Sequence, residues 1–139
     1  MARVKGKGNR STEERVAAVL RETGVDGWVR HSADLPGRPD FHFPDLGIAV
    51  FVDGCFWHGC PKCDRNLPRT RTEFWRSKIA ATRRRDRRVT AELRREGTRV
   101  MRVWEHQLRD GSWLSALRRL LSHAGYDWRA ALRQAQERQ

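Results

Sequence analysis

Three cysteines stand close together in a C-x4-C-x2-C pattern, at Cys55, Cys60 and Cys63. Three neighbouring thiols cannot all pair with one another as disulfides, whereas thiolates are ligands that zinc prefers. A tetrahedral zinc site needs a fourth donor, for which His106 is our candidate. His58 is the alternative, because it too lies within reach of the cysteines. The pattern therefore predicts a structural zinc loop closed by one of two histidines.

A second set of residues could hold a harder cation. Asp40 follows a turn made rigid by Pro39, and its carboxylate suits magnesium, which proteins bind through one or two carboxylates. The apolar run ahead of the cysteines ends at Val52 and Asp53. Either the Val52 carbonyl or the Asp53 carboxylate could supply a second oxygen, and the sequence leaves both open. His58 follows shortly after, where an imidazole could act as a general base.

These residues also have purely structural explanations. Pro39-Asp40 and Asp53-Gly54 are ordinary turn pairs. Glu13 lies in the first turn of an expected helix, where a favourable interaction with the helix dipole is a simpler explanation than catalysis. The chemistry therefore depends on whether Asp40 and His58 meet in one pocket.

Two large aromatic residues, Phe56 and Trp57, lie between the first cysteine and His58. Exposing such groups without a purpose is unfavourable. They could pack beneath the zinc loop, or they could insert between the base pairs of a duplex, where unstacking costs roughly a few kcal/mol. The spacing leaves both possibilities open.

The charge balance indicates a polyanionic partner. The chain has 29 Lys and Arg against 17 Asp and Glu, a formal net charge of +12. Within the basic run from Arg83 to Arg88, we select Arg84, Arg85 and Arg88 as candidate phosphate contacts, the alternative being a solvated helix face. The aromatic strand motifs of common single-stranded RNA modules are absent, which favours duplex DNA.

The sequence also favours a particular cellular setting. No apolar run approaches the roughly 18 residues that a membrane span needs, and the first residues lack the apolar core of a signal peptide. Closely spaced reduced cysteines fit a cytoplasmic protein better than a secreted one. We therefore expect a soluble protein associated with the nucleoid, with no membrane partner.

The length of 139 residues predicts one domain. Residues 1–10 are expected to be a flexible basic arm, 11–123 the catalytic domain and 124–139 a polar tail that frays. The first expected helix starts at a capping box formed by Ser11 and Glu14 and ends near Gly24. The remaining expected elements are a strand at 28–30, strands at 40–43 and 48–52 joined by a turn, a long helix at 71–95, a strand at 98–104 and a helix at 112–123.

This order of elements predicts an α/β fold in which helices cover both faces of a mixed sheet. The alternation in 40–43 places Asp40 and His42 on one side and two phenylalanines on the other. A hairpin between the second and third strands would bring Asp40 to the same edge of the sheet as Val52 and Asp53. The fold class therefore already predicts where a metal site would form.

Several segments, taken in order, carry a resemblance to a known family. They are Leu35-Pro36-Gly37-Arg38-Pro39-Asp40-Phe41, Gly54-Cys55-Phe56-Trp57-His58, Arg71-Thr72-Glu73-Phe74-Trp75 with Lys78-Ile79, Arg85-Asp86-Arg87-Arg88, and Val103-Trp104-Glu105. Together they resemble the very short patch repair (Vsr-type) DNA mismatch endonucleases. The resemblance implies a restriction-endonuclease-like fold and a magnesium-dependent nick in one strand, beside a thymine opposite guanine.

The resemblance also implies roles for single residues. Asp40 matches a metal-binding aspartate, Val52 a residue whose carbonyl binds metal, and His58 a catalytic histidine. Glu13 matches a glutamate that assists catalysis. The resemblance further implies that an aromatic pair, here Phe56 and Trp57, intercalates into DNA, and that Met1 is the candidate for an apolar wedge from the amino-terminal arm.

The chain departs from the family pattern at both metal sites. Val52 and Asp53 replace a threonine and a histidine, which adds a carboxylate beside the magnesium position. Cys60 replaces a histidine, one extra residue precedes Cys63, and His106 replaces a cysteine. The zinc set still sums to three cysteines and one histidine. Asymmetric cutting suits a monomer, and a requirement for repair-protein partners stays open.

Overall fold

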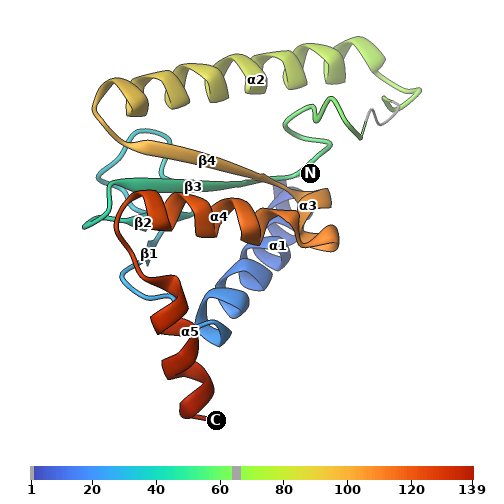
Figure 1. Cartoon of the computed structure of the whole chain (residues 1–139). Coiled ribbons are helices and arrows are strands. Elements are labelled where there is room, and N and C mark those ends of the chain that lie inside the picture. Colours follow the sequence, from blue (N-terminus) through green and yellow to red (C-terminus); the bar gives the residue numbers. More distant parts are fainter. Residues whose placement is uncertain (1, 64–66) are drawn as a thin grey trace.

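The computed structural model describes residues 2–63 and 67–139, and its centre is a four-stranded sheet (Figure 1). Across the sheet the strands are β1 (Val29–Arg30), β2 (Phe41–Phe43), β3 (Ile48–Asp53) and β4 (Arg99–Trp104). The first two pairs are antiparallel, and β3 pairs with β4 in parallel. The predicted hairpin and the predicted mixed sheet are thus confirmed.

Helices cover both faces of this sheet. The helices of the described residues are α1 (Ala2–Glu22), α2 (Thr72–Arg95), α3 (Glu105–Asp110), α4 (Ser112–His123) and α5 (Trp128–Glu137). In Figure 1, α2 lies along one face, while α1 and α4 lie on the other. This arrangement confirms the predicted layers.

Strand β3 is buried on both faces because its side chains alternate between two cores. Ile48, Val50 and Val52 pack into the larger core together with apolar side chains of α1 and α4, such as Leu20 and Leu117. This side of the sheet supports the amino-terminal helix that carries Glu13.

The opposite face of β3 packs against the long helix α2. Ala49 and Phe51 form the smaller core with Leu93 of α2, and Val89 packs against it. Because α2 is fixed to this face, polar residues one or two turns before Leu93 are held over the carboxyl end of β3. The sequence of α2 thus positions charged groups beside Asp53.

The structure corrects the predicted ends of the chain. Helix α1 begins at Ala2 and not at Ser11, so the backbone of residues 2–10 is helical, whereas the first helix was expected to start only after the basic arm. The predicted fraying tail was also wrong, because Trp128–Glu137 form α5 and Ala135 is buried. Asp127 caps this helix by accepting a hydrogen bond from the Ala130 N–H at 3.0 Å. The assignment of residues 11–123 as the catalytic unit stays a prediction.

Over residues 2–63 and 67–139, no helix combines the length and the apolar character needed to cross a bilayer.

Candidate active site and metal centre

The carboxyl ends of β3 and β4 lie side by side because the two strands are parallel. Their register pairs Asp53 with Trp104, so the cysteine loop that follows β3 emerges next to the start of α3. The contact is anchored where the Cys55 N–H donates to Glu105 Oε1 at 3.3 Å. This topology explains how His106 reaches cysteines that are far away in sequence.

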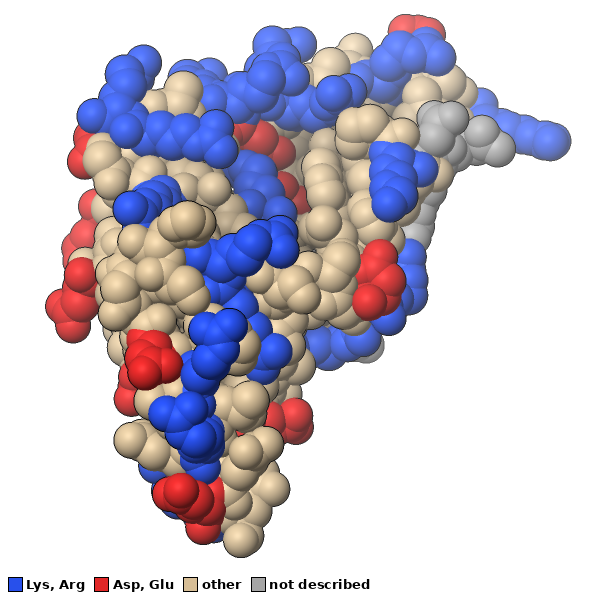
Figure 2. Space-filling view, viewed as in Figure 1, with Lys and Arg blue, Asp and Glu red and all other residues tan. Residues whose placement is uncertain are grey.

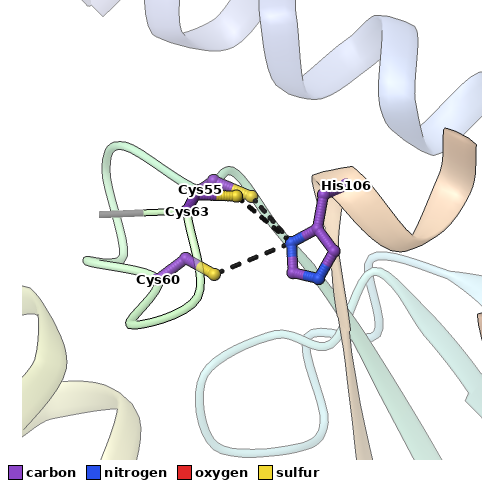
Figure 3. A group of neighbouring side chains, drawn as sticks. All are labelled: Cys55, Cys60, Cys63 and His106. Carbon is purple, nitrogen blue, oxygen red and sulfur yellow. Dashed lines mark hydrogen bonds between the residues drawn. The ribbon is translucent and has the colours of Figure 1, made fainter. Parts of the chain in front are cut away.

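Three thiols and one imidazole converge at this point, as Figure 3 shows. The His106 Nδ1 atom lies 3.5 Å from the Sγ of Cys55, 3.7 Å from that of Cys60 and 3.3 Å from that of Cys63. Zinc–sulfur and zinc–nitrogen bonds of about 2.3 and 2.0 Å at a tetrahedral angle would separate S from N by about 3.5 Å. The four side chains therefore fit a single tetrahedral ion.

Burial disfavours an uncompensated thiolate in this cluster. It raises the pKa of the Cys55 thiol to about 12, although the hydrogen bond with His106 opposes the shift. A bound metal ion would displace the thiol proton, since the thiolate is the coordinating form. The donor set thus has the chemistry of a structural metal centre, and the structure places His106, not His58, within it.

Asp40 lies immediately before β2 and faces the end of β3. Its Oδ2 accepts a hydrogen bond from the Val52 N–H at 2.7 Å. Because the N–H and C=O of one strand residue point towards the same neighbouring strand, the Val52 carbonyl faces the Asp40 side as well. Asp40 and Val52 are thus brought together as the hairpin predicts.

Glu13 reaches the same region from α1. It is only 8% exposed, and its Oε2 lies 3.2 Å from Arg30 Nη2 and 3.0 Å from His31 Nε2. Glu13, His31 and Asp40 each offer a ligand atom, and these atoms lie within 4.8 Å of one another. Because α1 begins at Ala2, Glu13 does not lie in the first turn of the helix, and an interaction with the helix dipole does not explain its position.

The electrostatics of this corner favour a cation. Burial, a hydrogen bond with Glu13 and the charges of Glu13 and Asp53 raise the pKa of Asp40 to about 8, against the opposing effect of the Val52 N–H. Carboxylates held this close repel one another unless a proton or a cation lies between them. The site is therefore built to gain from a divalent ion.

His58 belongs to a separate cluster on the α2 side of the sheet. Its Nδ1 lies 2.6 Å from Asp86 Oδ2 and 3.8 Å from Asp53 Oδ1. A carboxylate can only accept, so the short contact makes Nδ1–H the donor and leaves Nε2 of the neutral ring as a proton acceptor. Asp86 thus sets the tautomer of His58 that a general base needs.

The two carboxylates of this cluster have opposite pKa shifts. Burial raises the pKa of Asp53, although His58 and Arg102 oppose it. Burial acts in the same direction on Asp86, but the hydrogen bond and charge of His58, together with Arg102, lower its pKa overall. Asp86 is therefore the carboxylate that stays ionised beside the imidazole.

Asp40 of the first cluster and all three residues of the second line one cleft. A cavity of about 170 Å³ is lined by Asp40, Val52, Asp53 and His58, with Asp86 beside them. The structure thus brings the predicted metal-binding and general-base residues to a common pocket. A larger cavity of about 380 Å³ also borders His58 and is lined by arginines of α2 such as Arg87.

Phe56 and Trp57 are half-buried in an aromatic cluster with α2. Trp75 contacts both, with ring centroids 5.8 Å from Phe56 and 5.5 Å from Trp57, and Phe74 continues the cluster at 5.2 Å from Trp75. In this structure the pair, which belongs to the cysteine loop, thus packs against α2. Because Phe74 is 43% exposed, the cluster still presents an apolar surface to solvent.

The basic candidates lie on α2. Arg84, Arg85 and Arg88 are exposed there, and Arg85 also lines the cleft. Figure 2 shows Lys and Arg gathered along the edge of the molecule that α2 occupies, with acidic side chains set beneath them. Met1, the remaining candidate, lies outside the described residues.

The structure adds site residues that the sequence reasoning missed. His31, Asp86 and Arg102 join the two acidic clusters, and Trp75 joins the aromatic one. The available signal for Asp86 was its position as the single acid within the run Arg83–Arg88. His31 and Arg102 had no such signal, because their partners come from other elements.

Comparisons with known proteins identify the family. The family model described as DNA mismatch endonuclease Vsr matches residues 1–65. The type II nicking enzyme V.XorIIP of Xanthomonas oryzae pv. oryzae is 41% identical over 122 residues, which are 87% of this chain and 88% of that protein.

Two further relatives match over shorter stretches. The DNA mismatch endonuclease Vsr of Escherichia coli is 43% identical over 97 residues, which cover 70% of this chain and 62% of the relative. The type II nicking enzyme V.NaeI of Lentzea aerocolonigenes is 46% identical over 70 residues, or 50% of this chain and 42% of the relative. Since similarity to V.XorIIP extends over most of both proteins, this chain belongs to the Vsr family of DNA endonucleases, which have a restriction-endonuclease-like fold.

Proposed function

We propose that this chain nicks one strand of duplex DNA beside the thymine of a T·G mismatch, with magnesium bound at Asp40. The observation that carries the proposal is the cleft shared by Asp40 and His58 at the carboxyl end of β3. The names of the relatives support nicking and mismatch recognition as the activities to test.

The magnesium site would be formed by Asp40 and one further oxygen at the end of β3. Asp40 offers a carboxylate, and the Val52 carbonyl or the Asp53 carboxylate is the second protein ligand. When bound, magnesium supplies stabilisation of the charge that develops on the scissile phosphate. Glu13, held by Arg30 and His31, adds negative charge beside Asp40 and helps to orient water there.

His58 is the proposed general base. With Nδ1–H donated to Asp86, its Nε2 takes a proton from water at the cleft and can later return it to the leaving oxygen. Asp86 acts through His58 as a positioning residue, since it fixes the orientation and tautomer of the ring. The donor set of three cysteines and His106 is best suited to zinc, which we propose as the structural ion.

Removing the base is expected to slow nicking without weakening DNA binding. His58→Ala should lower the single-turnover rate by about 10²–10⁴-fold, the usual contribution of a general base. Asp86→Asn should lower the rate by about 10–100-fold, because the His58 ring keeps a hydrogen-bond partner but that partner no longer carries a negative charge. The rates are measured on a labelled nicked strand. Asp45→Asn, in the exposed turn before β3, is the matched control. Wild-type rates for His58→Ala and Asp86→Asn would exclude a role of His58 as general base.

The aromatic cluster is proposed to supply the intercalating residues. Trp57→Ala should weaken binding to mismatched DNA by about 1–3 kcal/mol, the usual value of one stacking contact, and should affect a perfectly paired duplex less. Trp128→Ala on α5 is the control, because it removes an indole that contacts Arg118 and Arg129 instead. Equal losses on both duplexes would mean that Trp57 only supports the loop.

Phosphate contacts are proposed for Arg84, Arg85 and Arg88, which are exposed on α2. Each contact that is lost should reduce the slope of the logarithm of the binding constant against the logarithm of salt concentration by about 0.9. This loss should be similar for all DNA sequences, because phosphate contacts carry no sequence information.

A nickase without a mismatch requirement is the second candidate, because several relatives are named nicking enzymes with no mismatch in their names. One panel separates the possibilities. Duplexes that are T·G mismatched, methylated or fully paired are incubated with magnesium or with chelator. Cutting only of the T·G duplex in magnesium supports the proposal. Cutting of all duplexes indicates a general nickase, and binding without any cutting indicates a passive DNA-binding module.

A further inference from the structure

Arg102 uses every nitrogen of its guanidinium group within the site. Its Nη1 donates to both oxygens of Asp53 at 3.2 and 3.0 Å, and its Nη2 donates to the Asp86 backbone carbonyl at 3.2 Å. Its Nε donates to Thr90 Oγ1 at 3.0 Å. The group also stacks on Phe51, 4.3 Å from the ring centroid. Such a side chain has a single, fixed geometry.

Strand geometry separates Asp53 from the Asp40 corner. Adjacent strand residues point to opposite faces, so Asp53 lies on the α2 face with Phe51, whereas Val52 packs into the core of α1 and α4. Asp40 groups with Glu13, while Asp53 groups with His58 on the α2 side. Both carboxylates nonetheless line the same cleft, so Asp53 needs a restraint to stay out of a metal shell there.

A free Asp53 would also compete for the proposed general base. Its Oδ1 lies 3.8 Å from the same His58 Nδ1 that Asp86 contacts at 2.6 Å. Two carboxylates beside one imidazole proton would offer two hydrogen-bonded arrangements of the ring. The Arg102 Nη1 atom lies 3.0 Å from Asp53 Oδ2 and 3.8 Å from Asp86 Oδ1, so its charge offsets their repulsion.

We propose that Arg102 is a positioning residue that restrains the Asp53 carboxylate, keeping it off both the metal ion and the His58–Asp86 hydrogen bond. This inference rests on the proposed function of the cleft. It leaves the second protein oxygen of the metal site to the Val52 carbonyl, as the family resemblance implies, and gives Asp53 no metal contact. It also accounts for the presence of a carboxylate directly before Gly54: this chain provides an arginine on the neighbouring strand that holds it.

The claim that Asp53 makes no metal contact is tested on protein without DNA. Binding of Mn²⁺ is measured by electron paramagnetic resonance for the wild type, Asp40→Asn and Asp53→Asn. The dissociation constant should rise at least about tenfold in Asp40→Asn, because a charged ligand is lost, and stay within about twofold in Asp53→Asn. Equal weakening in the two variants would make Asp53 a metal ligand and overturn the proposal.

The claim that Arg102 protects the His58–Asp86 hydrogen bond is tested with Arg102→Met, which keeps a long side chain but removes the charge. Proton NMR follows the downfield Nδ1–H resonance of His58, and nicking is measured in parallel. The resonance should broaden or vanish, and nicking should fall by about 10–100-fold, as is usual when a supporting contact is lost. Arg99→Met, an exposed arginine on the same strand, is the control.

A double variant separates restraint from misfolding. Asp53→Asn combined with Arg102→Met removes the competing charge together with its restraint, so it should regain the resonance and at least about tenfold in nicking rate over Arg102→Met alone. A double variant as impaired as the single one, or an Arg102→Met protein with unchanged resonance and rate, would overturn the proposal. If the wild type nicks no duplex, the proposed function fails, while the metal and NMR measurements still decide this inference.

Discussion

Replacing Asp40 with asparagine is expected to lower the single-turnover nicking rate by at least about 10³-fold. A metal ion supplies several kcal/mol of transition-state stabilisation, and each 1.36 kcal/mol corresponds to about a factor of ten. The asparagine oxygen can still accept the hydrogen bond from the Val52 N–H, so the hairpin should keep its geometry. The measurement is the rate of strand cleavage at saturating enzyme and magnesium.

Protein stability distinguishes loss of metal from loss of fold in this experiment. Asp40 stands among like charges from Glu13 and Asp53, which raise its pKa together with burial. A neutral amide removes that repulsion, so the melting temperature of Asp40→Asn without magnesium should not fall below that of the wild type. Asp45→Asn serves again as the exposed control. Wild-type nicking by Asp40→Asn would rule out the proposed metal ligand.

The hairpin part of the site could be predicted because its signals are local in sequence. The turn at Pro39, the alternation after Asp40 and the apolar run up to Val52 together specify two paired strands and their common edge. Asp40 and Val52 had to meet once these strands paired. A slip of one residue would turn every side chain of β2 to the opposite face of the sheet.

The α2 side of the site could not be predicted in the same way. Asp86 lies on α2 and Arg102 on β4, and these elements meet only in the folded chain, where Leu93 of α2 and Val100 of β4 join the same small core. In sequence, Asp86 looks like a member of a solvated charged run, because burial depends on the rotation of α2 over the sheet. The interaction between Asp86 and His58 is therefore a property of tertiary packing.

The wrong predictions for the two ends of the chain have a similar cause. The tail 124–139 was judged by its polar composition, but Trp128, Ala131 and Ala135 recur at helical spacing behind a capping Asp127. This short apolar stripe is sufficient because α4 provides a surface for it. At the other end, the capping-box pattern at Ser11 fell inside a longer helix.

Removing the fourth ligand of the cysteine cluster is expected to have the second largest effect. His106→Ala should reduce bound zinc, measured by elemental analysis, from one equivalent per chain to well below one. The nicking rate should fall by at least about 100-fold, because a displacement of about 1 Å at a reacting group can have this effect. His123→Ala, an exposed histidine on α4, is the control.

The physical reason lies in where the loop carries its functional groups. Phe56, Trp57 and His58 all lie between the first two cysteines, so the ion and the proposed base share one short loop. Without the ion, burial favours the protonated thiol at Cys55, and the loop is held to α3 only by weaker contacts such as the hydrogen bond from the Cys55 N–H to Glu105. The His58 ring would then keep only its hydrogen bond to Asp86 as an anchor.

A conservative variant tests whether His106 acts only as a metal ligand. His106→Cys offers a thiolate from the same position on α3, and four cysteines form an accepted zinc shell. It should bind one equivalent of zinc and recover most of the nicking rate that His106→Ala loses. Recovery of zinc without recovery of nicking would mean that His106 contributes more than a ligand. Full nicking by zinc-free His106→Ala would show that the sheet and α2 alone hold His58 in place, with the hydrogen bond to Asp86 as a sufficient anchor.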